Sequence, residues 1–574
     1  MTSASPRLPA NTLSPVMPDI SRAAFRAAFR AAFRSSVRAT LRRLPSWIGL
    51  LLALLLLLTS SLAQASGADA HVTVDLNTVI NPDSQRLLGT TFDARTSTKK
   101  KQIALGYYNS VDGTLLPGVA PLWNQLTLST LRYPGNATLK NFNFQETIGP
   151  AANRPTVDWG SGPQQLIFGF DEFMAMAASR GVDNAHIQLM VSLYTTYSGQ
   201  TPAQNAADWV EYTNGIYDPN GQSNPNGGTD WAAVRAANGH PLPYGVKIWN
   251  IGNEPWSPAE FDMNVAQYVP VAADFIAQMK AVDPTIHITL PAAGATTMPT
   301  PGGLQRRAQM TVWDTTLLST FGGSIYGLSQ HLFYDGSTCH GVGAAQQAVE
   351  LLAQQIAASG YPVRLLIGDQ AHAISTAATP CTQPNNADFA MQWQGAVRTA
   401  EFLLMAANQP AVERANFWIW GMPQAVWHPI RRNADGSYTM LAVGQLYAQL
   451  PSLLHSEAVG ASVASPASAD GNSYSMRAGA FRSADKSRLT VVVVNRDAGV
   501  SHSADIAGVD GYSLTAARLL SGASPSADNY TSTDLPAAAE YTLPGLSILV
   551  LEYQTATVTA TAAIPAIWLP VITN

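Results

Sequence analysis

The chain has few of the residues that build metal centres and disulfide frameworks. Its 574 residues include only two cysteines, Cys339 and Cys381, and ten histidines. No two histidines have the His-x-x-x-His spacing with a nearby acid that is typical of zinc sites. We therefore expect neither a metal nor another cofactor. A hydrophobic content of 46%, with charges of both signs, excludes a disordered or fibrous protein.

The first 65 residues contain no lysine and one acid, Asp19, but eight arginines. The apolar run Trp47–Leu58 and then Ala63-Gln64-Ala65 follow, in the order found in secretory signal peptides. This run is shorter than the roughly 20 residues of a membrane span. We therefore expect residues 1–65 to be removed on export, so that the protein is secreted without stable membrane association. An uncleaved signal anchor is the alternative.

Export has consequences for partners and for the cysteines. Without the leader the net charge is −12, since the leader holds eight of 33 basic and one of 38 acidic residues. Such an acidic chain is a poor partner for nucleic acid or anionic lipid. In an oxidising compartment, Cys339 and Cys381 are expected to form one disulfide. Cys339 follows the sixth and Cys381 the seventh of the barrel strands predicted below, so neighbouring rim loops should bring the two residues together.

From Arg86 onward, short apolar strands alternate with amphipathic helices. Eight such alternations predict an α/β fold, a (β/α)₈ barrel with long loops on one face. The strands are expected at Leu87–Phe92, Thr130–Tyr133, Ile187–Leu193, Val246–Asn253, Ile286–Leu290, Ile325–Leu332, Val363–Ile367 and Asn416–Trp420. Helices are expected at Phe170–Ser179, Ala203–Asn214, Val265–Val282, Ala344–Ser359 and Gln392–Ala407.

After Pro429 the pattern changes to short strands between Gly, Pro, Asp and Ser clusters, which is typical of a β-sandwich. The early strand Val72–Leu76 alternates apolar and polar residues, and could join this sandwich. The predicted division is a signal peptide over 1–65, an N-terminal strand over 66–85, the barrel over 86–430, the sandwich over 431–554 and a Thr/Ala-rich tail over 555–574.

The most informative stretch is Val246–Trp256, which runs from an apolar strand directly into a carboxylate. Pro255 cannot donate a ladder hydrogen bond, so Glu254 should lie at the carboxyl end of its strand. In an α/β barrel this end is the catalytic rim, where a glutamate can act as general acid and base. Asn253 can bind a sugar hydroxyl, and Trp256 offers an apolar face to a sugar ring. A helix-capping acid is the alternative role for Glu254.

Several ordered motifs resemble the α-L-arabinofuranosidase family of retaining glycoside hydrolases. They are Ala206–Gly215, Trp231–Pro241 leading into Gly252-Asn253-Glu254, Leu131-Arg132-Tyr133-Pro134-Gly135 on the second strand, and Ser329–Tyr334 on the sixth. The resemblance covers most of residues 72–553. It implies hydrolysis of terminal α-L-arabinofuranosyl or related bonds by two carboxylates, on the fourth and seventh strands.

The resemblance also implies roles for single residues. Glu254 matches the general acid/base, and Arg132, Asn253 and His331 match rim residues that hold the sugar or the nucleophile. Beside the resemblance, Tyr334, Trp256 and Trp420 are expected to bind the sugar, Trp420 being part platform and part core. Arg132 could instead pair with a structural acid, and His331 could be a hydrogen-bonded core histidine.

The chain departs from the family at the seventh strand, where a retaining enzyme needs a glutamate about 5 Å from the acid/base. Here the sequence reads Ile367-Gly368-Asp369-Gln370. One alignment puts Asp369 in the nucleophile position, and the other puts Gln370 there, whose amide cannot attack an anomeric carbon. Two functions follow: a glycosidase using Glu254 and Asp369, or a catalytically impaired carbohydrate-binding relative. The residue Gly368 favours Asp369.

Overall fold

The computed structural model describes residues 68–92, 107–108, 114–135, 142–158, 163–194, 199–221, 223–257, 261–293, 303–335, 341–372, 387–420, 427–468 and 473–555. The predicted signal peptide, Cys339, Cys381 and all of the tail after Thr555 lie outside these residues, so their predictions stay predictions. Within the described ranges, no helix is both long enough and apolar enough to span a membrane.

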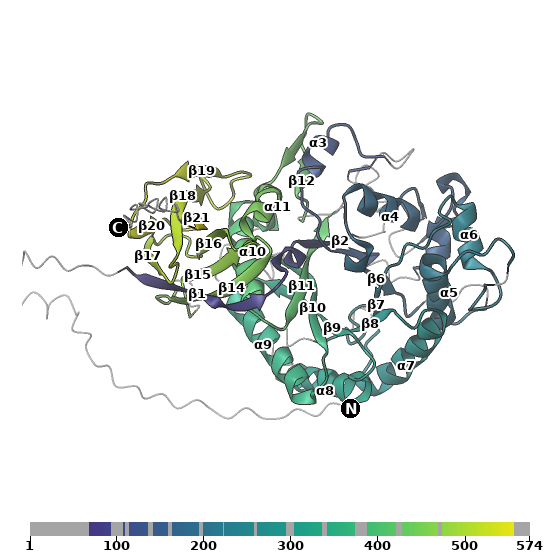
Figure 1. Ribbon diagram of the computed structural model, residues 1–574. Coiled ribbons are helices and arrows are strands. Elements are labelled where there is room, and N and C mark those ends of the chain that lie inside the picture. Colours follow the sequence, from purple (N-terminus) through teal and green to yellow (C-terminus); the bar gives the residue numbers. More distant parts are fainter. Residues whose placement is uncertain are drawn as a thin grey trace, which may run out of the picture. The chain divides into compact units, whose positions relative to one another are not determined.

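Eight parallel strands close into a barrel, in the order β10-β11-β2-β3-β6-β7-β8-β9 (Figure 1). Each predicted barrel strand overlaps one of them. The strands are β2 (Gly89–Phe92), β3 (Leu131–Tyr133), β6 (Ile187–Val191), β7 (Ile248–Ile251), β8 (His287–Pro291), β9 (Gly327–Tyr334), β10 (Arg364–His372) and β11 (Val412–Trp420).

The helices α4, α5, α7, α8, α9 and α10 connect these strands and lie outside the barrel (Figure 1). Their starts and stops follow from local chemistry. Thr201 and Gln204 form a capping box at the start of α5, and Gly360, with φ 72°, ends α9 in the left-handed conformation that glycine adopts readily. The bounds are α4 (Phe170–Ser179), α5 (Pro202–Asn214), α6 (Trp231–Ala237), α7 (Val265–Val282), α8 (Gly303–Phe321), α9 (Val342–Ser359), α10 (Trp393–Ala407) and α11 (Ala442–Leu453).

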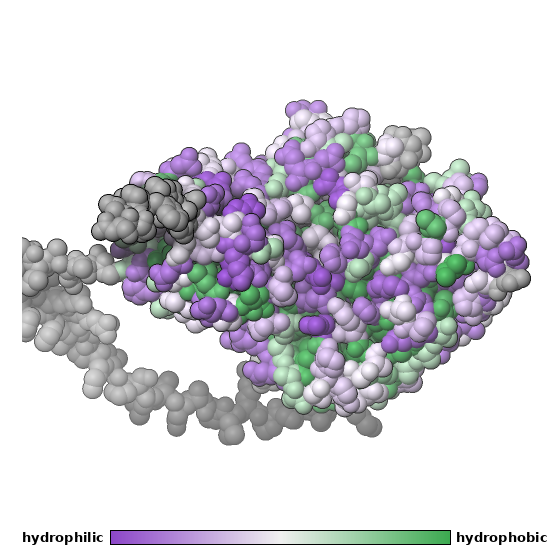
Figure 2. Space-filling view, in the orientation of Figure 1, coloured by the Kyte–Doolittle hydropathy of each residue, from purple (hydrophilic) through white to green (hydrophobic). Residues whose placement is uncertain are grey.

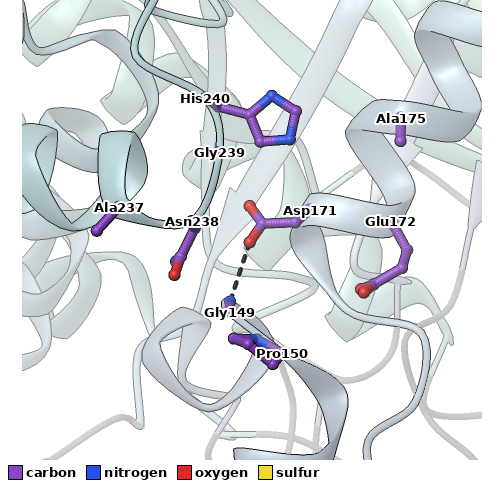
Figure 3. Close-up of a pocket in the computed structure, with 9 residues that line it drawn as sticks. All are labelled: Gly149, Pro150, Asp171, Glu172, Ala175, Ala237, Asn238, Gly239 and His240. Atoms are coloured by element: carbon purple, nitrogen blue, oxygen red, sulfur yellow. Dashed lines mark hydrogen bonds between the residues drawn. The ribbon is translucent and has the colours of Figure 1, made fainter.

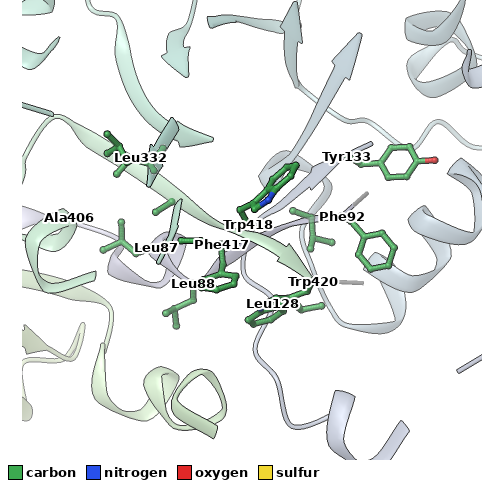
Figure 4. Close-up of a cluster of buried hydrophobic side chains, with 14 of the residues drawn as sticks. Leu87, Leu88, Phe92, Leu128, Tyr133, Leu332, Ala406, Phe417, Trp418 and Trp420 are labelled. Carbon is green, nitrogen blue, oxygen red and sulfur yellow. The ribbon is translucent and has the colours of Figure 1, made fainter. Parts of the chain in front are cut away.

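A continuous hydrophobic cluster joins the barrel wall to its helices (Figure 4). Phe417 and Trp420 of β11 are fully buried, and Trp420 packs edge to face on Tyr447 of α11 with ring centroids 4.7 Å apart. Two strands further round the barrel, Tyr133 of β3 stacks on Phe173 of α4. The removal of these apolar side chains from water is the main stabilising contribution to such a fold. The barrel rim is therefore a rigid support for the side chains it carries.

Nine of the remaining strands form one sheet in the order β19-β18-β21-β16-β15-β14-β1-β17-β20, and the other four form the two-stranded sheets β4-β5 and β12-β13. Strand β1 (Ala70–Asn81), from the start of the described chain, pairs antiparallel with β14 (Glu457–Ala464). The other strands of the nine-stranded sheet are β15 (Met476–Arg482), β16 (Arg488–Asn495), β17 (His502–Ala507), β18 (Tyr512–Ser521), β19 (Thr531–Asp534), β20 (Glu540–Leu543) and β21 (Ser547–Thr555).

Alternate residues of these strands have different packing partners. In β16, Leu489, Val491 and Val493 belong to a core of the sheet's own, whereas Val492 and Val494 belong to the core cluster of the barrel. This alternation is the two-residue period of a strand buried on both faces. The predicted fold class is confirmed: a closed parallel barrel is followed by a separate strand-rich domain. Hydrophilic and hydrophobic residues are interspersed on the face shown in Figure 2.

Candidate active site

Glu254 lies three residues beyond Ile251, the last residue of β7, on the rim formed by the carboxyl ends of the strands. Its backbone has φ 35°, in the left-handed region that non-glycine residues rarely adopt. Its carbonyl accepts a hydrogen bond from Ser257 N at 2.8 Å, and Pro255 O accepts one from Met263 N at 2.9 Å, so the chain turns back on itself here. A strained backbone held by its surroundings is characteristic of functional sites.

Asp369 lies on β10, at a break in the ladder. The pairing of β10 with β9 shifts between Ile367 and Asp369, which leaves Gly368 as a bulge. A Cβ at position 368 would lie only 2.4 Å from Ser329 Oγ and 3.0 Å from His331 Nε2, so the bulge requires glycine. An extra residue in a strand inverts the alternation of the residues that follow it. Asp369 is thereby brought to the same side as His331.

Arg132 and His331 connect the two carboxylates. Arg132 Nη1 donates to Asp369 Oδ2 at 2.7 Å, and the guanidinium is fully buried. His331 Nδ1 lies 2.7 Å from Glu254 Oε1, and its Nε2 lies 3.4 Å from Asp369 Oδ2. The imidazole therefore bridges the carboxylate of the fourth strand and that of the seventh. Arg132 Nη2 also donates to Asn253 Oδ1 at 2.9 Å, which brings the side chain of Asn253 into the same cluster.

Gln370 faces away from this cluster. Its Oε1 accepts a hydrogen bond from Tyr334 at 2.8 Å, and its Nε2 donates to Tyr447 of α11 at 3.3 Å. Gln370 is completely buried. The amide thus holds β10 against β9 and α11, on the side of the barrel wall that packs on helices.

Two residues expected to contact sugar lie in the core instead. Tyr334 is fully buried, its ring stacks on Phe402, and burial raises the pKa of its hydroxyl well above the ordinary value. Trp420 is also fully buried, between Tyr447 and Trp123. A ring with no exposed surface cannot serve as a platform, so the predicted roles of Tyr334 and Trp420 are wrong. Trp256 is partly exposed on the rim and packs edge to face on Trp313 with ring centroids 5.5 Å apart.

Thr91 belongs to the cluster although the sequence did not suggest it. Its Oγ1 donates to Asp369 Oδ1 at 2.5 Å. Strand β2 pairs Thr91 with Arg132 of β3, so the first two barrel strands present both Asp369 partners side by side. The only sequence signal is a hydroxyl residue near the end of the first predicted strand.

A different hollow lies between α4 and the turn that follows α6, and it contains none of these residues (Figure 3). It has a volume of about 470 Å³. The Asp171 carboxylate on its wall accepts hydrogen bonds from Tyr212 and Tyr244, and from Gly149 N at 3.0 Å. Burial raises the pKa of Asp171. Since these bonds hold α4 to its neighbours, the carboxylate has a structural use here.

Residues 122–320 match the family model described as the alpha-L-arabinofuranosidase 1 domain. An intracellular exo-alpha-(1->5)-L-arabinofuranosidase 1 from Bacillus subtilis is 28% identical over 186 residues, which are 32% of this chain and 33% of that protein. A probable alpha-L-arabinofuranosidase C from Aspergillus clavatus is 28% identical over 170 residues, 29% of this chain and 30% of that protein. The matched region thus spans about one third of the length of these curated relatives.

The fold is similar over a much larger part of the chain. A family 51 alpha-L-arabinofuranosidase from Bifidobacterium longum has a TM-score of 0.69 at 19% identity, covering 85% of this chain and 100% of that one. The alpha-L-arabinofuranosidase from Thermotoga maritima has a TM-score of 0.67 at 20% identity, covering 84% of this chain and 100% of that one. The chain is therefore an arabinofuranosidase-like barrel protein, similar to the α-L-arabinofuranosidases in sequence over residues 122–320 and in fold beyond them.

Proposed function

We propose that this protein is an exported glycoside hydrolase that removes terminal α-L-arabinofuranosyl groups from plant-type polysaccharides or oligosaccharides. The observation that carries the proposal is the bridge between two carboxylates on one barrel rim: His331 contacts Glu254 on one side and Asp369 on the other. Paired carboxylates are the chemical requirement for cleaving a glycosidic bond. The names of the sequence relatives supply the sugar.

In the proposed reaction Glu254 protonates the glycosidic oxygen while Asp369 attacks the anomeric carbon from the opposite face of the ring. The bond to the leaving group breaks, and a covalent glycosyl-enzyme forms. Glu254 then takes a proton from water, whose oxygen attacks the same carbon and releases Asp369. Arg132 compensates the charge of the buried Asp369, and Thr91 orients its second oxygen.

The packing of Gln370 supports Asp369 as the nucleophile. Because both polar ends of the Gln370 amide bond to tyrosine hydroxyls, this side chain has a structural role. Asp369 is one methylene shorter than the glutamate usual in retaining enzymes, and its contacts with Arg132 and Thr91 fix its carboxylate among the rim residues.

The test is hydrolysis of a panel of aryl glycosides that includes 4-nitrophenyl α-L-arabinofuranoside, together with an arabinofuranosyl oligosaccharide, and Glu254→Gln is the matched variant. The expected result is that the wild type releases nitrophenol and cleaves the oligosaccharide, and that Glu254→Gln does not cleave the oligosaccharide, whose leaving group needs protonation. Labelling of Asp369 by a 2-fluoro glycoside, located by peptide mapping, would identify the nucleophile. Sugar binding with no turnover of any glycoside would instead favour the catalytically impaired carbohydrate-binding relative.

A further inference from the structure

The main chain at Glu254 needs support from its surroundings. Glu254 has φ 35°, a left-handed conformation that costs free energy in any residue with a Cβ. Its contact with His331 orients the carboxylate, but this contact lies at the far end of the side chain. Such strain persists only where neighbouring contacts fix the chain. Aromatic side chains of the outer helices α7 and α8 make such contacts on both sides of Glu254.

Tyr268 of α7 anchors the chain before Glu254. Its hydroxyl donates to Ile251 O at 2.7 Å, and Ile251 is the last residue of β7. The Tyr268 side chain is fully buried, and burial raises the pKa of its hydroxyl well above the ordinary value. The hydroxyl therefore stays protonated and remains a donor. This bond holds the end of β7 against α7, three residues before the carboxylate.

Trp313 of α8 anchors the chain after Glu254. Its ring packs edge to face on Trp256, two residues beyond Glu254, with centroids 5.5 Å apart. It also stacks on Tyr268, with centroids 5.0 Å apart. The indole Nε1 donates to Pro291 O at 2.9 Å, at the end of β8. One buried side chain thus connects the segment after Glu254, the anchor Tyr268 and the neighbouring strand.

The next residue of α8, Asp314, is fixed to the same part of the chain. Ala293 N, two residues beyond β8, donates to Asp314 Oδ1 at 2.8 Å, and Asp314 is buried. Two consecutive residues of α8 therefore hold the main chain at the end of β8. Because a close-packed interior leaves little space for a side chain to shift, Trp313 is a fixed support for Trp256.

We propose that Trp313 is a positioning residue for the general acid: together with Tyr268 it fixes the main chain on both sides of Glu254, and thereby the place that the carboxyl group reaches. The inference rests on the proposed role of Glu254. A general acid must lie within hydrogen-bond reach of the glycosidic oxygen, and a misplacement of about 1 Å can lower the rate about 10²-fold. Without the anchors, Glu254 can relax to a less strained conformation and withdraw its carboxyl group.

The test compares phenyl α-L-arabinofuranoside with 2,4-dinitrophenyl α-L-arabinofuranoside, using the full-length protein. Phenolate is a poor leaving group that needs protonation, whereas dinitrophenolate departs without it. For each variant, kcat/KM for the phenyl glycoside is divided by kcat/KM for the dinitrophenyl glycoside. Both values come from the same sample, so this ratio does not depend on the fraction of the protein that is folded. A loss of stability alone therefore leaves the ratio unchanged.

Three variants weaken the anchors to different extents. Trp313→Leu removes the ring contacts and the indole donor, and we expect the ratio to fall about 10²-fold. Tyr268→Phe keeps the ring stack and removes only the hydrogen bond to Ile251 O, so we expect a fall of about tenfold. Trp313→Phe keeps an aromatic ring beside Trp256, and the ratio should fall less than in Trp313→Leu.

Trp393→Leu is the matched control. Trp393 of α10 is also buried, its Nε1 donates to Leu546 O at 2.7 Å, and its ring packs on Tyr530 with centroids 5.1 Å apart. It makes the same kinds of contact as Trp313, but with the strand-rich domain. We expect Trp393→Leu to leave the ratio unchanged.

The outcomes separate this inference from the proposed function. If the wild type hydrolyses both glycosides and Trp313→Leu has the wild-type ratio, the positioning role alone is overturned. If Trp313→Leu yields no folded protein, wild-type ratios in Tyr268→Phe and Trp313→Phe overturn it in the same way. Failure of the wild type to hydrolyse either glycoside would overturn the proposed function and the positioning role together.

Discussion

Replacing Asp369 with asparagine changes one atom of the side chain and removes its charge. The asparagine carbonyl oxygen can still accept a hydrogen bond from Arg132, and its NH2 group can donate to Thr91 Oγ1, so the cluster should keep its geometry. Asparagine cannot form the bond to the anomeric carbon that a carboxylate forms. We expect kcat/KM for an aryl α-L-arabinofuranoside to fall at least about 10⁴-fold, equivalent to about 5.5 kcal/mol of transition-state stabilisation.

The same substitution has a separate cost in stability. The guanidinium of Arg132 is fully buried and 2.7 Å from Asp369 Oδ2, so Asp369→Asn leaves an uncompensated cation inside the barrel. Breaking such a pair costs about 3 kcal/mol. Denaturant unfolding measures this cost, and rates must be compared where both proteins are folded. Thr91→Val is the control, because it removes one hydrogen bond and keeps the carboxylate; we expect about a tenfold loss of kcat/KM.

If folded Asp369→Asn keeps more than one tenth of the wild-type kcat/KM, Asp369 is not the nucleophile. If water attacked the anomeric carbon directly, without a covalent intermediate, the sugar released first would have the inverted anomeric configuration. NMR of the first-formed anomer would detect this.

Four further outcomes are expected. Glu254→Ala should slow substrates with poor leaving groups most, and azide should restore turnover of activated ones; unchanged activity on an oligosaccharide would exclude Glu254 as the acid. Gln370→Glu should give no gain in kcat/KM, since position 370 faces two tyrosines. Mass spectrometry of unreduced peptides should find Cys339 linked to Cys381 in secreted material, and two free thiols would refute the link. Burial raises the pKa of Asp314 to about 7, from an ordinary value of 3.8, so the free energy of unfolding should decrease as pH rises through this interval. Asp314→Asn should remove that dependence, worth up to about 4 kcal/mol, in urea titrations at several pH values.

The barrel could be predicted from the sequence because its strands are short apolar runs that end at breaking residues. Pro255 and the polar rim residues mark where strands stop, and caps such as Thr201 mark where helices start. Helix α8 was missed because its apolar and polar residues are not segregated into a stripe, so it lacks the periodicity on which helix prediction depends. Helix α11 was missed because Gly444 and Pro451 interrupt its pattern.

The candidate site could be predicted only where strand position decides the direction of a side chain. Glu254, Arg132 and His331 lie at or near the carboxyl ends of strands, and the barrel topology then brings them to one rim. Tyr334 and Trp420 are also near strand ends, but a side chain there can face either the rim or the surrounding helices. Tyr334 packs on Phe402 and Trp420 packs on Tyr447, so both rings face the surrounding helices. Phe402 and Tyr447 are distant in sequence from the rings they cover, so the sequence pattern near each strand does not show these contacts.

The alternatives Asp369 and Gln370 differ by a single position, and in a strand one position is the difference between two opposite faces. Strict alternation from Ile367, which packs in the hydrophobic core, would turn Gln370 toward the site and Asp369 away from it. The bulge at Gly368 inverts this order. Glycine is permitted at many strand positions for other reasons, so its presence does not predict a bulge. What requires glycine in the bulge is the approach of Ser329 and His331 from β9, which leaves no space for a Cβ. Gly368, which carries no chemistry of its own, therefore decides whether Asp369 or Gln370 faces the cluster of Arg132 and His331.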